Sequence, residues 1–171
     1  MHHPIVLIMG VSGSGKTTIG AMLAGRLGWR YAEADDFHPP ANVEKMHAGV
    51  PLTDEDRWPW LRAIGAWMHE QDAPAVVTCS ALKRKYRDVL RESRPDLHLV
   101  YLDGSKELIG GRLAARHGHF FPRQLLDSQF ADLETPAPDE NALIVSIDQP
   151  IETIVEEIHR RLDLPPGPVG R

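Results

Sequence analysis

The sequence has little cysteine, no long apolar run and no dominant charge, and each shortage excludes a class of protein. Its single cysteine, Cys79, cannot form an internal disulfide, which favours a reducing compartment such as the cytoplasm. No apolar run approaches the roughly 20 residues that a membrane-spanning helix needs, and residues 4–9 are too short for a signal peptide. The formal net charge of −5 offers nucleic acid no general attraction. We therefore expect neither a membrane nor nucleic acid as a partner.

Length and apolar patterning predict a single α/β domain over residues 1–171. A chain of 171 residues, 42% of them hydrophobic, can enclose one full core. Short apolar runs at 5–9, 31–34, 75–79, 97–102 and 143–147 are typical of strands, and segments with helical spacing separate them. This alternation predicts a three-layer fold, in which helices cover both faces of a mainly parallel five-stranded sheet.

Three local expectations accompany this outline. Ser80 is placed to cap a helix over residues 81–92. Pro59 predicts either a kink or a second start in the helix that follows Thr53. Four basic residues recur on one helical face, which is most often a solvated face; they are Lys83, Arg87, Arg91 and Arg94.

Residues 10–17 form a glycine-rich loop that matches GxxxxGK[ST] in full and lies between a predicted strand and a predicted helix. In such a loop, backbone N–H groups converge on phosphates at a helix N-terminus. Lys16 is expected to reach the β- and γ-phosphates of ATP, and the Thr17 hydroxyl to bind Mg²⁺. The predicted nucleotide-binding residues of this segment are Gly10, Ser12, Gly13, Ser14, Gly15, Lys16, Thr17 and Thr18.

The rest of the sequence narrows the kind of phosphate-loop protein. A GTPase should carry an Asn-Lys-x-Asp motif, and the chain has none. A motor-type ATPase should end a second apolar strand in aspartate, whereas the run at 75–79 ends in Ser80. Acidic residues stand instead at 33–36, about twenty residues after the loop, as is typical of small-molecule and nucleotide kinases.

Four segments of the chain resemble the gluconokinase family and together cover most of residues 9–140. They are MGVSGSGKTTIG, EADDFHPPANVEKMHAGVPLTDEDRWPWL, CSALKRKYRDVLR, and RHGHFFPRQLLDSQFADLE followed by PDE. The first is generic to phosphate-loop kinases, and the others are far more specific. One departure is Glu33, where the family pattern has aspartate; the acidic function survives. The resemblance implies an acceptor-binding region at about 36–70 and a mobile lid at about 112–125.

The resemblance also implies roles for residues on the acceptor side. Asp35 would accept the proton of the acceptor hydroxyl, although Asp36 is an alternative base. Arg57 would bind the gluconate carboxylate, as an arginine of the shikimate kinases does with its acid substrate, unless it merely pairs with Asp54 or Glu55. His38 is either a contact of the acceptor or a packing residue. Lys83, close to a strand end, is a further candidate for the acceptor site.

Two arginines and a glutamine complete the predicted site. Arg112 and Arg116 are one helical turn apart, and adenylate kinases place two arginines at this spacing. That likeness assigns Arg112 to adenine and Arg116 to the phosphates, where it would act in catalysis beside Lys16 and Asp35. In the family, Gln129 lies near the acceptor, although a solvated helix position is the ordinary reading. Cys79 is interpreted as a small buried residue rather than a nucleophile.

The sequence as a whole thus predicts a cytoplasmic gluconokinase that uses ATP and Mg²⁺ to convert D-gluconate into 6-phosphogluconate, which feeds the pentose phosphate pathway. A homodimer is expected from the family resemblance alone. Two alternatives stay open at this stage: a kinase of another small acid, such as shikimate, or of a nucleotide, and a nucleotide-binding sensor without phosphotransfer. The sensor is disfavoured because it needs neither an acceptor region nor a lid.

Overall fold

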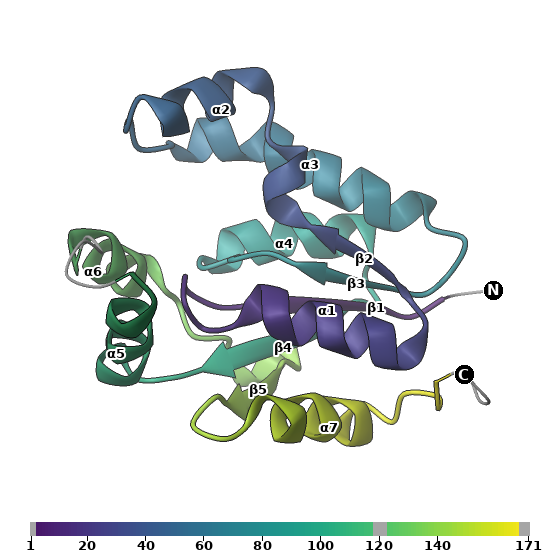
Figure 1. Cartoon of the computed structure of the whole chain (residues 1–171). Coiled ribbons are helices and arrows are strands. Elements are labelled where there is room, and N and C mark those ends of the chain that lie inside the picture. Colours follow the sequence, from purple (N-terminus) through teal and green to yellow (C-terminus); the bar gives the residue numbers. More distant parts are fainter. Residues whose placement is uncertain (1–2, 118–122, 168–171) are drawn as a thin grey trace.

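A computed structural model describes residues 3–117 and 123–167, so the centre of the predicted lid lies outside the described residues. Within this part of the chain, strands and helices alternate as the sequence predicts (Figure 1). Their bounds are β1 Ile5–Met9, α1 Lys16–Leu27, β2 Arg30–Glu33, η1 Ala34–Phe37, α2 Pro40–His47, α3 Asp54–Glu70, β3 Ala75–Thr78, α4 Arg84–Ser93, β4 His98–Asp103, α5 Lys106–His117, α6 Arg123–Asp132, η3 Pro138–Glu140, β5 Leu143–Ser146 and α7 Ile151–Arg161.

The described strands form one five-stranded sheet in the order β2-β3-β1-β4-β5, and each neighbouring pair is parallel. The predicted α/β class and five-stranded sheet are therefore confirmed. β1 is the central strand, so the glycine-rich loop that follows it opens at the middle of the sheet's carboxyl edge. Ligands of open α/β sheets bind beyond this edge, at the point where the strand order reverses.

Alternate residues of β1 point into two separate cores. Val6 and Ile8 pack with α1 and α7 on one face, whereas Ile5, Leu7 and Met9 pack with α3 and α4 on the other. All five side chains are at most 1% exposed. Burial on both faces explains why this strand reads as a continuous apolar run rather than as an alternating pattern.

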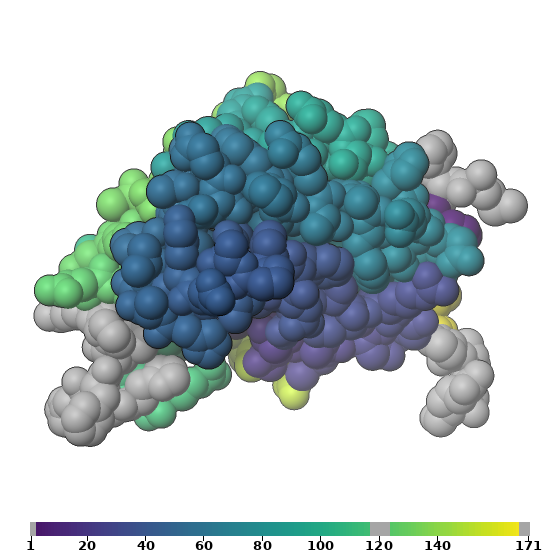
Figure 2. All heavy atoms as spheres, turned by 90° about the horizontal axis from the view of Figure 1, so that it is seen from above, coloured from purple at the N-terminus to yellow at the C-terminus, as the bar shows by residue number. Residues whose placement is uncertain are grey.

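The segment from α2 to the start of α3 projects from the carboxyl edge of the sheet and occupies the middle of the face seen in Figure 2. Thr53 and Asp56 form a reciprocal capping box at the N-terminus of α3. Pro59 lies inside one helix that runs to Glu70, so the alternative of a second helix start is wrong. A proline in the second turn removes a single helical hydrogen bond, to Glu55, and the capping box stabilises the same end.

The predicted cap at Ser80 is wrong. Ala81 adopts a left-handed conformation (φ 45°), which separates Ser80 from α4, and Lys83 becomes the N-cap residue without a side-chain cap. The backbone N–H of Arg84 donates instead to Oε1 of Glu134, at 2.9 Å. The start of α4 is thus set by a residue 50 positions further along the chain.

The predicted solvated stripe is also wrong for Arg87 and Arg94, which are 1% and 8% exposed. Arg87 pairs with Glu140 of η3, at 2.7 Å from Nε to Oε1, and the side chain of Glu140 is equally buried. Nη1 of Arg87 also donates to the carbonyl of Ala81, and Nη2 to that of Glu134. A buried charge tolerates desolvation only when it is paired and fully hydrogen-bonded, and Arg87 meets both conditions.

Candidate active site

The loop between β1 and α1 has the backbone that phosphate binding requires. Gly15, the N-cap of α1, has φ 97°, which favours glycine. Gly13 has φ 83°, and a Cβ there would approach Cγ of Leu113 to 2.6 Å, so a larger residue would also clash with α5. None of the described residues accepts a hydrogen bond from the backbone N–H of Gly13, Gly15 or Lys16. These unpaired donors at a helix N-terminus form a fitting site for anionic oxygens.

The Lys16 side chain folds back over this loop. Its Nζ donates to the carbonyls of Gly10 and Val11, at 2.8 and 3.1 Å. Burial lowers the pKa of Lys16 below its usual value, although the charge of Asp35 opposes this. A partly desolvated ammonium held by neutral carbonyls is well suited to exchange them for the charged oxygens of a phosphate chain.

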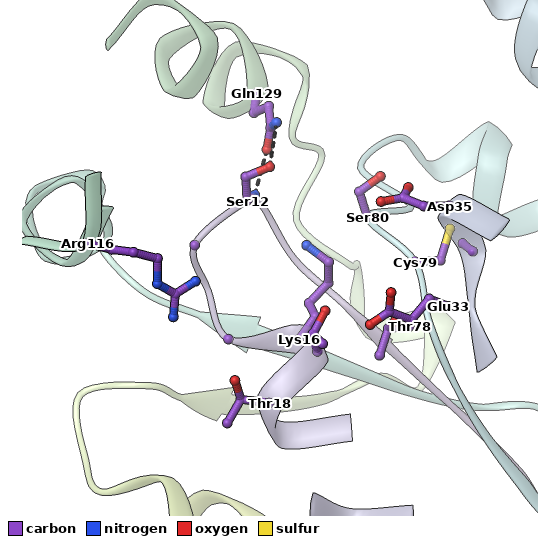
Figure 3. A pocket seen from close by; sticks show the side chains of 14 residues that line it. Ser12, Lys16, Thr18, Glu33, Asp35, Thr78, Cys79, Ser80, Arg116 and Gln129 are labelled. Carbon is purple, nitrogen blue, oxygen red and sulfur yellow. Dashed lines mark hydrogen bonds between the residues drawn. The ribbon is translucent and has the colours of Figure 1, made fainter. Parts of the chain in front are cut away.

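The loop opens into a cleft of about 370 Å³, in which Lys16, Arg116 and Asp35 approach one another from three directions (Figure 3). The loop and α1 form one wall, and the carboxyl ends of β2 and β3 form another. The lining residues are Ser12, Gly13, Gly15, Lys16, Thr17, Thr18, Glu33, Ala34, Asp35, Thr78, Cys79, Ser80, Arg116 and Gln129.

The cleft has the donor set that a magnesium–nucleotide complex requires, with no complete metal cage. The Thr17 hydroxyl and the carboxylates of Glu33 and Asp35 border the same space. Among the residues described, no group of three or more His, Cys, Asp or Glu side chains could hold a metal ion. Mg²⁺ commonly binds through one or two protein oxygens plus substrate phosphates, so these residues fit it. The Glu33 carboxylate is oriented by the Tyr31 hydroxyl, at 2.9 Å.

The structure distinguishes Asp35 from Asp36 and shows how burial affects Cys79. Asp35 lines the cleft, whereas Asp36 is not among its lining residues. Cys79 also lines it, but burial raises the pKa of its thiol to about 12. A thiol with that pKa is a poor nucleophile.

His38 is not among the residues that line the cleft, but it is close enough to Asp35, which does line it, for their charges to interact. Its ring stacks on Trp60, with centroids 4.3 Å apart and planes 14° apart. Nδ2 of Asn42 donates to the Asp56 carbonyl at 2.8 Å and lies 3.2 Å from Nδ1 of His38, so Nδ1 is the acceptor. Burial lowers the pKa of His38, with the charges of Asp35 and Arg57 acting in opposite directions. A neutral ring therefore presents Nε2–H as its free donor.

Arg57, in the first turn of α3, contacts Tyr86 of α4. Its Nη1 donates to the carbonyl of Leu52 at 2.9 Å and to the hydroxyl of Tyr86 at 3.2 Å. Tyr86 in turn donates to Oδ1 of Asp54, and Nζ of Lys83 lies 3.9 Å from the same oxygen. The guanidinium is thus held by a tyrosine rather than by Asp54 or Glu55. Because both hydrogen bonds use Nη1, the Nη2 edge stays available to a planar anion.

The remaining predicted residues are Arg112, Arg116 and Gln129, and each has different contacts. Arg116 lines the cleft from α5, whereas Arg112 lies outside its lining, where Nη2 donates to the carbonyl of Ile147 at 2.7 Å. Gln129 of α6 contacts the phosphate loop itself, through two hydrogen bonds with Ser12. The sequence alone gave no sign of this last contact, because the partners are 117 residues apart.

Comparisons with known proteins agree with this fold. The shikimate kinase family model matches residues 12–163. A gluconokinase of Gluconobacter oxydans (strain 621H) is 49% identical over 158 residues, which cover 91% of this chain and 89% of that protein. A solved gluconokinase structure from Sinorhizobium meliloti 1021 is 46% identical, with a TM-score of 0.86 over 94% of this chain and 91% of that one. A sugar kinase structure from Janibacter sp. HTCC2649 is 49% identical, with a TM-score of 0.87 over 96% of this chain and 97% of that one.

No helix in the described part of the chain is long and apolar enough to span a membrane.

Proposed function

The chain belongs to the gluconokinases, within the wider shikimate kinase family, and from this membership we propose that it transfers the γ-phosphoryl group of ATP to D-gluconate. The observation that carries the proposal is one cleft lined by Lys16, Arg116 and Asp35, two cations and a carboxylate (Figure 3). Phosphoryl transfer needs alignment and charge stabilisation more than covalent help from the protein, and this cleft supplies both.

Each of these side chains has a separate task in the proposed reaction. Asp35 orients the 6-hydroxyl of gluconate and takes its proton as the new bond between oxygen and the γ-phosphorus forms. The bond between that phosphorus and the bridging oxygen breaks, and the electron pair leaves with ADP. Lys16 and Arg116 neutralise the charge that spreads over the phosphoryl oxygens during transfer. Mg²⁺, when held by Thr17 and the nearby carboxylates, supplies further positive charge to the phosphates.

The acceptor site runs from Asp35 through His38 to Arg57. The charges of Asp35 and Arg57 both act on the His38 ring, so the three lie within electrostatic reach of one another. A sugar acid whose terminal hydroxyl is at Asp35 can extend along this line, with its carboxylate at Arg57 and a hydroxyl hydrogen-bonded to Nε2 of His38. Lys83 places a second positive charge near Arg57, because both side chains contact the ring of Tyr86; Nζ of Lys83 lies 5.8 Å from the centroid of that ring.

The proposal is tested by measuring ADP release with a panel of acceptors that contains gluconate, glucose and shikimate. We expect turnover with gluconate to exceed that with every other acceptor by a wide margin. Faster turnover with shikimate than with gluconate would indicate a kinase of another small acid. ATP binding without turnover on any acceptor would indicate a nucleotide sensor. On family grounds we further propose a cytoplasmic homodimer, which light scattering of the purified protein would check.

Replacing Arg57 by alanine should narrow the preference for gluconate over glucose. Glucose has no carboxylate, so the wild-type protein leaves the Arg57 fork without its anionic partner, at a cost of roughly 2–4 kcal/mol. The variant should lose most of that difference, measured as the ratio of kcat/KM for the two acceptors. Arg62→Ala, which removes an exposed cation from the same helix, serves as the control. A full preference retained by Arg57→Ala would mean that another residue binds the carboxylate.

Replacing Lys16 by alanine should lower turnover about 100-fold, on the order of 3 kcal/mol, as for other preorganised charge donors. The free energy of unfolding should change little, because the Lys16 ammonium contacts two loop carbonyls and no apolar core. Steady-state ADP release and thermal unfolding would be compared with Arg26→Ala, which removes an exposed cation from the same helix. Near-normal turnover of Lys16→Ala would contradict the role given to this residue.

A further inference from the structure

The contact between Gln129 and Ser12 is a two-point clasp between α6 and the phosphate loop (Figure 3). The backbone N–H of Ser12 donates to Oε1 of Gln129 at 2.6 Å. Nε2 of Gln129 donates back to Oγ of Ser12 at 2.9 Å. Both residues line the cleft, so this clasp occupies part of the surface on which a nucleotide would rest.

Ser12 differs from its neighbours in the loop because a side chain occupies its N–H, whereas the N–H of Ser14 donates to the backbone carbonyl of Val11. The N–H groups of Gly13, Gly15 and Lys16 have no acceptor among the described residues, whereas that of Ser12 is taken by a side chain. A side chain can leave such a donor by rotating, which a backbone partner cannot do. Ser12 is therefore the point at which the loop's supply of phosphate-binding donors can change.

The position of Ser12 along the loop indicates which phosphate it would meet. The lysine of a phosphate loop reaches the β- and γ-phosphates. Lys16 holds the carbonyls of Gly10 and Val11, the two residues that directly precede Ser12. In Figure 3, Thr18 of α1 lies on the far side of Lys16 from Ser12. The clasp thus lies at the end of the loop that the terminal phosphate would occupy.

The helix that carries the clasp has contacts in its middle and just beyond its C-terminus. Leu126 is 3% exposed in the core, and Asp127 pairs with Lys106 of α5 at 2.6 Å. Beyond the C-terminus of α6, the N–H of Glu134 donates to the carbonyl of Leu82 at 2.8 Å. This bond joins α6 to the loop that carries Lys83. Gln129 therefore reaches Ser12 from a helix that packs against the core.

We propose that Gln129 distinguishes a nucleoside triphosphate from a diphosphate. In the nucleotide-free protein it holds the N–H and Oγ of Ser12, and it releases both to the γ-phosphate of ATP. ADP lacks this phosphate and leaves the clasp closed. A side chain that occupies a site in the free protein weakens the binding of each ligand that must displace it. It leaves the binding of other ligands unchanged. The inference rests on the nucleotide-binding part of the proposed function and not on the identity of the acceptor.

The first test measures calorimetric binding of ADP and of the non-hydrolysable β,γ-imido analogue of ATP. Gln129→Ala should bind the analogue about five- to 150-fold more tightly than the wild-type protein, the range expected when two competing hydrogen bonds are removed. Its affinity for ADP should stay within about twofold. Gln124→Ala, which truncates an exposed glutamine on the same helix, should change neither affinity. Equal changes for the two nucleotides, or weaker binding of the analogue, would overturn the proposal.

The second test needs no variant in the measured sample. The side-chain amide signals of Gln129 in the wild-type NMR spectrum, identified by their loss in Gln129→Ala, should shift with the analogue and stay in place with ADP. Signals that move equally with both nucleotides, or with neither, would contradict the proposal. If the wild-type protein binds neither nucleotide, the proposed function and this inference both fail. If nucleotides bind as expected but gluconate is not phosphorylated, only the acceptor assignment fails.

Discussion

Replacing Asp35 by asparagine is expected to lower kcat with gluconate roughly 100- to 10,000-fold, the usual contribution of a positioned general base. The amide keeps the shape of the carboxylate and can still orient a hydroxyl, but it cannot accept the proton. Because Arg57 and His38, the proposed contacts of gluconate, are unchanged, KM should change much less than kcat. Steady-state kinetics over a range of gluconate concentrations would separate the two parameters.

Asp36→Asn provides the matched control, because Asp36 is the same residue type at the adjacent position and is not among the residues that line the cleft. Its turnover should stay within about threefold of the wild-type value, since exposed substitutions away from the reacting groups have small effects. Loss of turnover in Asp36→Asn with retention in Asp35→Asn would transfer the role of base to Asp36. Thermal unfolding of both variants would show whether either change acts through the fold.

Replacing Glu140 by glutamine is expected to reduce the free energy of unfolding by about 3–5 kcal/mol, because it leaves the Arg87 guanidinium buried without its counter-ion. That is a large share of the roughly 5–15 kcal/mol by which a domain of this size is stable. Urea unfolding followed by circular dichroism would measure the loss. Asp139→Asn breaks the neighbouring pair with Arg84, whose side chains are 42% and 66% exposed, and should cost about 1 kcal/mol or less. Equal losses from the two substitutions would contradict this account.

The acid stability of the protein should depend on the same pair. Burial alone would raise the pKa of Glu140, but hydrogen bonds from Arg87, Ala137 and Arg91 outweigh it and hold the pKa at about 2. A carboxyl whose pKa is lowered from 4.5 on folding stabilises the protein above pH 4.5 and loses that contribution as the pH falls toward about 2. Unfolding of Glu140→Gln between those pH values should accordingly vary less with pH than unfolding of the wild-type protein.

The sequence predicts features that consecutive residues form, and it misses features that depend on contacts between residues far apart along the chain. The strand at residues 5–9 and the helix that begins at Lys16 are recorded in consecutive residues, so the sequence predicts both, and the structure confirms them. Arg87 was assigned to a solvated face because helical spacing shows only its neighbours on the helix, and Glu140 lies 53 residues away. The cap at Ser80 failed for the same reason, since Glu134 fixes the start of α4.

The candidate site follows the same division. Lys16 and Thr17 were predicted from a motif that states its own spacing, and Asp35 from the family resemblance; the structure brings all three to one cleft. No local pattern could connect Gln129 with Ser12, because an isolated glutamine on a helix resembles any solvated residue. The hydrogen bonds that hold His38 and Arg57 likewise come from other segments, through Asn42 and Tyr86.

The central place of β1 in the sheet has a consequence for how the protein is made. Val6 pairs with Val76 on one side and with His98 on the other, so the first strand to be synthesised must wait for both partners. At a rate of roughly 5–20 residues per second, the ribosome needs several seconds to supply them. During that interval the run Ile5–Met9 is an unpaired, fully apolar strand, the kind of segment that aggregates or binds a chaperone. The cleft is lined by residues as far along the chain as Gln129, so nucleotide can find the whole lining only in chains that extend beyond that residue.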